Sequence, residues 1–238
     1  MPDFAKDVIK SLCSYYESEG IRPDDGFHCK YQEFCNGDLA RGMQCHVGGK
    51  YGSRLRVLVA SLDCGGGGAS FIKDRTADVV KDAYGKKQDW HMRGTYQALS
   101  YFYGTDDRKE LVHYMAMTNT CKCCRKGEGK GSHDHLPAKY YKRCCEYSLA
   151  EIVRIMPEAI LFQGKLATTG CWDYLSDIEG IDDPEVKASL RYMDYQDLHC
   201  YAVICIHPSA RGRSMKRKVH FYNEVLPKIA QYVLSHPL

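Results

Sequence analysis

The sequence has no apolar run near 18 residues, which is about the length that a membrane-spanning helix needs. Its opening residues, MPDFAKDVIKSL, are charged and amphipathic and lack the apolar core of a signal peptide. The glycines at 65–68 have neither the GxGxxG spacing of dinucleotide sites nor the spacing of a P-loop. We therefore expect a cytoplasmic protein without a membrane partner and without these two nucleotide-binding motifs.

Size and composition are those of one globular domain spanning residues 1–238. Of the 238 residues, 44% are hydrophobic and 26% are charged, which allows a sizeable core. The net charge of +3 is too small to require a polyanionic partner. The basic residues are nevertheless uneven and gather at 122–130, 139–143 and 211–218. Such clusters are either solvated faces or contacts for phosphate groups.

Cysteine is abundant, with 13 residues. In a cytoplasmic chain, this number favours metal or cluster binding over disulfides. The cysteines near 29–45 and 121–145 lie in polar, glycine-rich surroundings and predict a metal-binding loop region. Cys171, Cys200 and Cys205 have apolar neighbours and are expected to be buried packing residues.

Hydrophobic periodicity predicts an α/β fold. Apolar residues three or four apart indicate helices, and short continuous apolar runs indicate buried strands. Helices and strands then alternate, which favours a three-layer α/β/α domain with a central, mostly parallel sheet. Residues 165–198 are expected to form a helix, a loop and an exposed connection. The expected helices are 3–19, 91–104, 145–156 and 216–234, and the expected strands are 56–62, 112–118, 159–163 and 199–206.

Polar residues follow three of the predicted strands. Asp63 precedes the glycine run, Asn119 ends an apolar run, and His207-Pro208-Ser209 follows another. Because the carboxyl ends of parallel strands meet at one edge of a sheet, we expect these residues to line a common ligand site.

The strand-end segments also carry motifs. A strand leads into Asp63 and glycines, and a second strand ends in a Thr-Asn-x-x-Lys-Cys pattern. A cysteine is then followed by a helix, Ile-x-Pro, a strand and a glycine, and the last motif is His-Pro-Ser. In this chain the motifs are Ser61-Leu62-Asp63-Cys64-Gly65, Thr118-Asn119-Thr120-Cys121-Lys122-Cys123, Cys144 through Ile155-Met156-Pro157 to Gln163-Gly164, and His207-Pro208-Ser209.

With these motifs, the chain resembles the uracil-DNA glycosylase superfamily and, within it, the iron–sulfur branch. The resemblance runs from about Cys29 to the last helix. Cys64 stands where that branch usually has proline, and Ala210-Arg211-Gly212-Arg213 replaces apolar residues that wedge into DNA. A segment near 71–90 looks inserted.

The resemblance implies a monofunctional DNA glycosylase for base excision repair. It would flip uracil or a related deaminated base out of DNA and hydrolyse its N-glycosidic bond. An amide such as that of Asn119 has the donors and acceptor that match uracil. Phe71 or Trp90 would stack on the base. His207 would donate to the departing base, and Asp63 would orient water and stabilise the cationic sugar.

The same resemblance implies DNA containing deaminated bases as the partner, a monomeric state and a nucleoid-associated location. Phosphate contacts are expected from Lys122, Ser209, Arg211 and Arg213.

The expected cofactor is a four-iron four-sulfur cluster on four thiolates. The expected ligands are Cys29, Cys35, Cys123 and Cys144, with Cys45, Cys121, Cys124 and Cys145 as neighbouring substitutes. Zinc on four thiolates is the alternative, because thiolates suit both metals and the spacing does not separate them.

The alternative function is a catalytically repurposed, metal-stabilised module that binds nucleic acid, which the departures at Cys64 and Arg211 favour. The sequence disfavours a zinc-dependent deaminase, because its His-x-Glu and Pro-Cys-x-x-Cys signature is absent.

Overall fold

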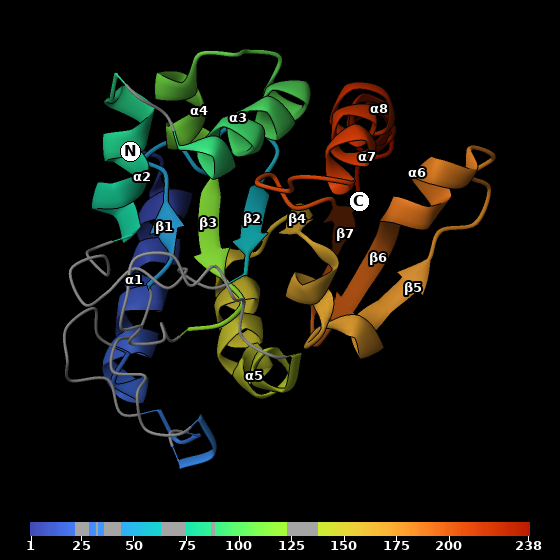
Figure 1. Cartoon of the computed structure of the whole chain (residues 1–238). Helices are drawn as coiled ribbons and strands as arrows, with labels where there is room; N and C mark the ends of the chain where they lie inside the picture. The colour runs from blue at the N-terminus through green and yellow to red at the C-terminus, as the bar shows by residue number, and fades with distance from the viewer. Residues whose placement is uncertain (22–28, 32, 36–43, 63–74, 87–88, 123–137) are drawn as a thin grey trace.

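The computed structural model describes residues 1–21, 29–31, 33–35, 44–62, 75–86, 89–122 and 138–238 (Figure 1). In this described part, a seven-stranded sheet has the order β1-β3-β2-β4-β7-β6-β5. The central strands β3, β2, β4 and β7 are parallel, whereas β1, β6 and β5 pair antiparallel at the sides. The strands are β1 (His46–Val47), β2 (Val57–Ser61), β3 (Ala116–Asn119), β4 (Ala159–Gln163), β5 (Leu175–Asp177), β6 (Leu190–Tyr195) and β7 (Leu198–Cys205).

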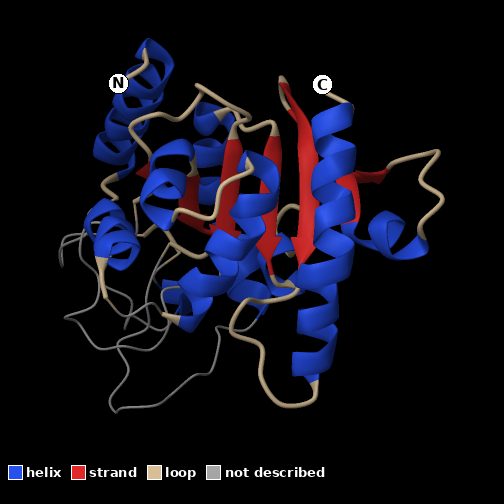
Figure 2. Ribbon diagram, turned by 90° about the horizontal axis from the view of Figure 1, so that it is seen from above, coloured by secondary structure: helices blue, strands red, loops and turns tan. Residues whose placement is uncertain are grey.

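Helices cover both faces of the sheet, which confirms the predicted three-layer α/β/α fold (Figure 2). Side chains alternate along each strand: Leu58 and Ala60 pack on one face, and Val57 and Val59 on the other. The first face packs against α1 (Asp3–Glu19) and α5 (Ala138–Ile155). The second packs against α2 (Arg75–Tyr84), α3 (Trp90–Tyr103), α4 (Arg108–Tyr114) and α8 (Leu226–Ser235).

Several predicted elements have the expected bounds. The helix at 3–19 and the strand at 159–163 are confirmed, and β2, β7 and α3 each lie within one or two residues of their predicted limits. Among the described helices, none combines the length and the apolarity needed to cross a membrane.

Other predicted bounds are wrong. The strand expected from residue 112 begins at Ala116, because Asp107 caps α4 by accepting from Lys109 N at 2.9 Å, and that helix continues to Tyr114. The helix expected from 145 begins at Ala138, so Cys144 lies inside α5. Residues 165–198 hold the two antiparallel strands β5 and β6, together with the short helix α6 (Pro184–Ser189).

The C-terminal helix is continuous but irregular. It runs as α7 (Ser214–His220), a π-helical turn at Phe221–Val225, and α8. Pro227 has no N–H to donate to the preceding turn, which is a common reason for such a deviation.

Candidate active site

A polar row crosses the carboxyl ends of three adjacent strands. Ser61 of β2 lies in register with Asn119 of β3, and Ser61 Oγ donates to Gln163 Oε1 of β4 at 2.8 Å. All three side chains are buried. Gln163 Nε2 donates to Thr95 Oγ1 of α3 at 2.7 Å, so the row lies on the α3 face of the sheet. Asn119 shares this face, because it lies two residues after Met117.

His207 lies at the same edge, just after β7, and packs against the first turns of α3. Its ring centroid lies 5.2 Å from that of His91. This closeness depends on glycine, because a Cβ on Gly94 would lie 2.8 Å from Pro208 Cβ. Gly164 adopts a φ of +104°, and a Cβ there would lie 3.5 Å from His207 Cβ. Gly94 therefore lets α3 approach the His207 loop, whereas Gly164 is favoured by its positive φ, because a Cβ there would make only an ordinary contact.

One hydrogen bond defines the chemistry of the His207 ring. The backbone N–H of Ser209 donates to His207 Nδ1 at 3.2 Å. An accepting Nδ1 carries no proton, so the neutral ring has its proton on Nε2. His207 can then act as a hydrogen-bond donor through Nε2.

A basic segment follows the His207 loop. Lys218 Nζ donates to the carbonyl of Pro208 at 3.1 Å, which ties α7 to the loop. Arg211 and Arg213 are exposed, as expected for phosphate contacts, and Ser209 is half-buried. Lys216 and Arg217 extend this exposed basic surface along α7.

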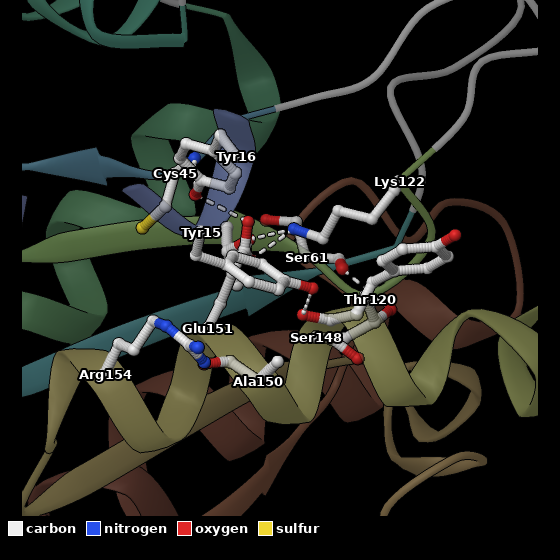
Figure 3. A network of polar contacts seen from close by, with 12 residues as sticks. Tyr15, Tyr16, Cys45, Ser61, Thr120, Lys122, Ser148, Ala150, Glu151 and Arg154 are labelled. Atoms are coloured by element: carbon white, nitrogen blue, oxygen red, sulfur yellow. Dashed lines mark hydrogen bonds and ion pairs between the residues drawn. The ribbon is translucent and has the colours of Figure 1, made fainter. Parts of the chain in front are cut away.

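Lys122 does not lie on that surface, which corrects the expectation that it contacts DNA. Its side chain has 0% exposure and forms an ion pair with the equally buried Glu151 of α5 (Figure 3). Lys122 Nζ also donates to Thr118 Oγ1 at 2.6 Å, and Thr118 donates to Glu151. Tyr16 Oη of α1 donates to the other carboxylate oxygen at 2.6 Å. A lysine held in this way has no route to a phosphate group.

The pKa of Tyr16 explains its donor role. Burial, and then the neighbouring Glu151 carboxylate, raise the pKa of Tyr16 well above its ordinary value. Tyr16 is therefore a neutral hydroxyl that donates to Glu151 and also accepts from the backbone N–H of Cys45 at 2.8 Å.

Two of the candidate thiols adjoin each other. Cys121 Sγ lies 3.7 Å from Cys144 Sγ, and both residues are buried. Cys29 belongs to the same core cluster, beside Tyr147 one turn further along α5. Within the described residues, however, no three or more potential ligands converge. Cys123, Cys124 and the side chain of Cys35 fall outside the described residues.

The donor set fits a thiolate site in kind, because soft, buried, adjacent thiols suit iron–sulfur clusters and zinc alike. Two thiolates about 2.3 Å from one tetrahedral zinc ion lie about 3.8 Å apart, close to the spacing of Cys121 and Cys144. In a cluster, each cysteine instead binds its own iron. The same spacing fits a hydrogen bond between two thiols, so it does not distinguish a single ion from a cluster. The family resemblance implies a cluster.

The other described thiols are placed differently. Cys45 and Cys145 are half-buried, and each Sγ contacts a backbone carbonyl, that of His46 and that of Lys142 respectively. Cys171, Cys200 and Cys205 are buried packing residues, as predicted. Burial raises the pKa of the Cys171 and Cys200 thiols to about 12, so both stay protonated.

Of the remaining candidates, Asp63 and Phe71 fall outside the described residues. Trp90 is the first residue of α3, and its side chain is 61% exposed at the edge that holds His207. Arg93 lies over its ring, 6.0 Å from the centroid.

No protein-family model matches this sequence, and no curated protein matches it significantly. The likeness to glycosylase motifs therefore depends on the residues of this chain alone.

Sequence reasoning did not single out Ser61, Thr95 or Gln163 as site residues, or His91 as a neighbour of His207. Gln163 ends an apolar run, as Asn119 does, and this shared pattern is the signal that could have identified it. Thr95 and His91 lie on a helix and carried no comparable signal, because only the fold brings them to the edge.

Proposed function

We propose that this protein is a DNA glycosylase that removes uracil or a related deaminated base by base flipping and hydrolysis. The observation that carries this proposal is that Asn119 and His207 lie at the same edge of the sheet. The two residues follow β3 and β7, with Ser61 and Gln163 on the strands between them. The edge thus offers an amide and an imidazole donor where open α/β sheets bind their ligands.

Asn119 would recognise the flipped base. Its amide offers two donors and one acceptor, which can match the imide N–H and a carbonyl of uracil. Cytosine presents a different pattern, and polar groups left unpaired in a buried site carry a free-energy cost. Burial of Asn119 supports this role, because water competes weakly for its amide there.

His207 would act on the leaving base. Cleavage of the N-glycosidic bond moves the bonding electrons onto the base, which departs with negative charge. A donor already oriented toward that charge lowers the barrier. The proton on Nε2, fixed by the Ser209 contact at Nδ1, supplies such a donor. Asp63 is the proposed partner that orients water and stabilises the cationic sugar.

The DNA backbone would bind along the basic segment. Arg211, Arg213, Lys216 and Arg217 are exposed beside the His207 loop and can pair with phosphates on either side of the flipped nucleotide. Trp90 offers an exposed aromatic face near the same loop, suited to stacking on a base.

The proposed metal site has a structural role. A cluster, or zinc, would crosslink the chain between residues 29–45 and α5 when bound. The proposed ligands are Cys29, Cys35, Cys123 and Cys144. Cys121, whose Sγ lies 3.7 Å from that of Cys144, is a neighbouring substitute.

The test is single-turnover release of base from labelled oligonucleotides that contain uracil, hypoxanthine or xanthine, in single and double strands. We expect release from at least one substrate, with unmodified cytosine and thymine left intact. If the wild-type protein binds DNA but releases none of these bases, the glycosylase proposal fails. The nucleic-acid-binding module then takes its place.

A further inference from the structure

The two residues that flank the end of β3 share one buried anchor. Thr118 lies just before Asn119, and Lys122 lies three residues after it. Both contact the same oxygen of Glu151, namely Oε2. Since the residues involved are fully buried, no solvent competes for these contacts. Glu151 of α5 therefore holds the chain on both sides of Asn119.

These contacts lie on the opposite face of the sheet from the polar row. Thr118 points toward α5, so its neighbour Asn119 points toward α3. The segment between the two anchors is tied to β2 as well, because Thr120 N donates to the Ser61 carbonyl at 2.8 Å and Cys121 N to that of Leu62 at 3.2 Å. Fixing Thr118 and Lys122 on one face thus sets the direction of Asn119 on the other.

We propose that the Lys122–Glu151 ion pair is a positioning device for Asn119, an inference that rests on the glycosylase function proposed above. Stability alone does not account for the pair. Charges lose hydration on burial, and a well-packed apolar pair of similar volume is often at least as stable. Directional contacts to one carboxylate oxygen provide what apolar packing lacks, a fixed orientation for the end of the strand.

The carboxylate itself offers a matched control. Glu151 Oε2 binds Lys122 and Thr118, beside Asn119, whereas Oε1 accepts from Tyr16 of α1 at 2.6 Å. Tyr16→Phe removes a contact of the same buried group but leaves the anchor of β3 in place. A purely structural role predicts similar effects of the two changes on excision, and a positioning role does not.

The test variant is the double replacement Lys122→Met with Glu151→Leu, which removes both charges together. A single Lys122→Met leaves Glu151 buried without its counterion, which is strongly destabilising. We expect the double variant to unfold cooperatively and to keep its DNA affinity. Its single-turnover rate on uracil should fall on the order of 10²-fold, the cost of a misplaced binding group. Its discrimination against cytosine should fall as well, because that discrimination depends on the Asn119 amide. Tyr16→Phe should keep both the rate and the discrimination.

Wild-type rate and discrimination in the folded double variant would overturn the inference, and so would an equal loss in Tyr16→Phe. If the double variant does not fold, Thr118→Val tests the inference instead. This change removes one contact to Glu151 Oε2 at nearly constant side-chain volume. It should lower the rate and the discrimination in the same direction by a smaller factor, and unchanged excision overturns the inference. If the wild-type protein excises no base, the proposed function itself fails and the positioning role fails with it.

Discussion

The backbone N–H of Ser209 donates to Nδ1 of His207 at 3.2 Å, and this contact places the ring proton on Nε2. Two contacts fix the loop that contains Ser209. Pro208 packs closely against Gly94 of α3, and Lys218 Nζ donates to the Pro208 carbonyl. The imidazole is therefore oriented before any ligand arrives, as electrostatic catalysis requires.

His207→Ala should lower the single-turnover rate of base release by on the order of 10²–10³, the usual cost of losing one preorganised donor. DNA affinity should stay near that of the wild type, because the phosphate contacts lie on other residues. His199→Ala is the control, since that histidine is exposed near the start of β7 and pairs with Asp194. Rapid-quench excision and filter binding measure the two quantities. If the excision rate and the DNA affinity both fall in His207→Ala, His207 contacts DNA and is not the proposed donor to the base.

Asn119→Asp should reduce uracil excision strongly, because an ionised carboxylate accepts hydrogen bonds but donates none. The donor to a uracil carbonyl is lost, and a charge is placed against the base. Asn223→Asp is the matched control, because Asn223 is exposed and its Oδ1 already accepts from Gln97. Excision by the variants is compared on one uracil substrate. Wild-type excision by Asn119→Asp counts against the assignment.

Arg211→Ala and Arg213→Ala should each weaken DNA binding with little effect on the excision rate at saturation. Each should also reduce the slope of log affinity against log salt by about one unit, the signature of one phosphate contact. Lys187→Ala, exposed on α6, should change neither. Affinity titrations across a salt series provide the measurement. If the slope of log affinity against log salt is unchanged in both arginine variants, DNA does not bind along this basic segment.

Cys144→Ser should abolish or sharply reduce metal content and lower the melting temperature, because α5 loses a link to the cysteine region. Cys13→Ser, exposed on α1, should retain the metal. Iron, sulfide and zinc are assayed after anaerobic purification, together with the visible absorbance expected of a cluster. Stoichiometric zinc without iron would support the zinc alternative. If Cys144→Ser keeps its full metal content, Cys144 is not a ligand.

Stability should fall as pH rises above about 8.5, the ordinary pKa of a cysteine thiol. Burial, and then Asp194, raise the pKa of Cys200 to about 12 in the folded chain, so the thiolate forms more readily in the unfolded chain. Each such thiol contributes a slope of up to about 1.4 kcal/mol per pH unit until its folded pKa is reached. Cys200→Ala should flatten this slope in denaturant titrations between pH 8.5 and 10.5, and Cys13→Ala serves as the comparison. An unchanged slope in Cys200→Ala contradicts the prediction.

Local patterns of apolar and polar residues predicted much of the fold. The apolar runs that became β2, β4 and β7 are short and continuous, as strands buried on both faces must be, and their carboxyl ends fall where polar residues begin. Asn119 could be placed at a sheet edge because this pattern requires only neighbours in sequence. The strands β5 and β6 were missed, since β6 is half-exposed and alternates imperfectly, and its identity depends on pairing with β7.

The sequence by itself determined the α/β class and the strand ends on which Asn119 and His207 lie, because periodicity and burial act over a few residues. The tertiary structure alone decided where Lys122 points. A lysine inside a basic cluster is expected at the surface, and only a carboxylate 29 residues away, on a helix packed against β3, makes its burial possible. The same holds for Gln163 and Thr95, which are 68 residues apart. A hydrogen bond between distant segments leaves no mark in the local sequence, so the polar row and the anchor behind it became visible only in the folded chain.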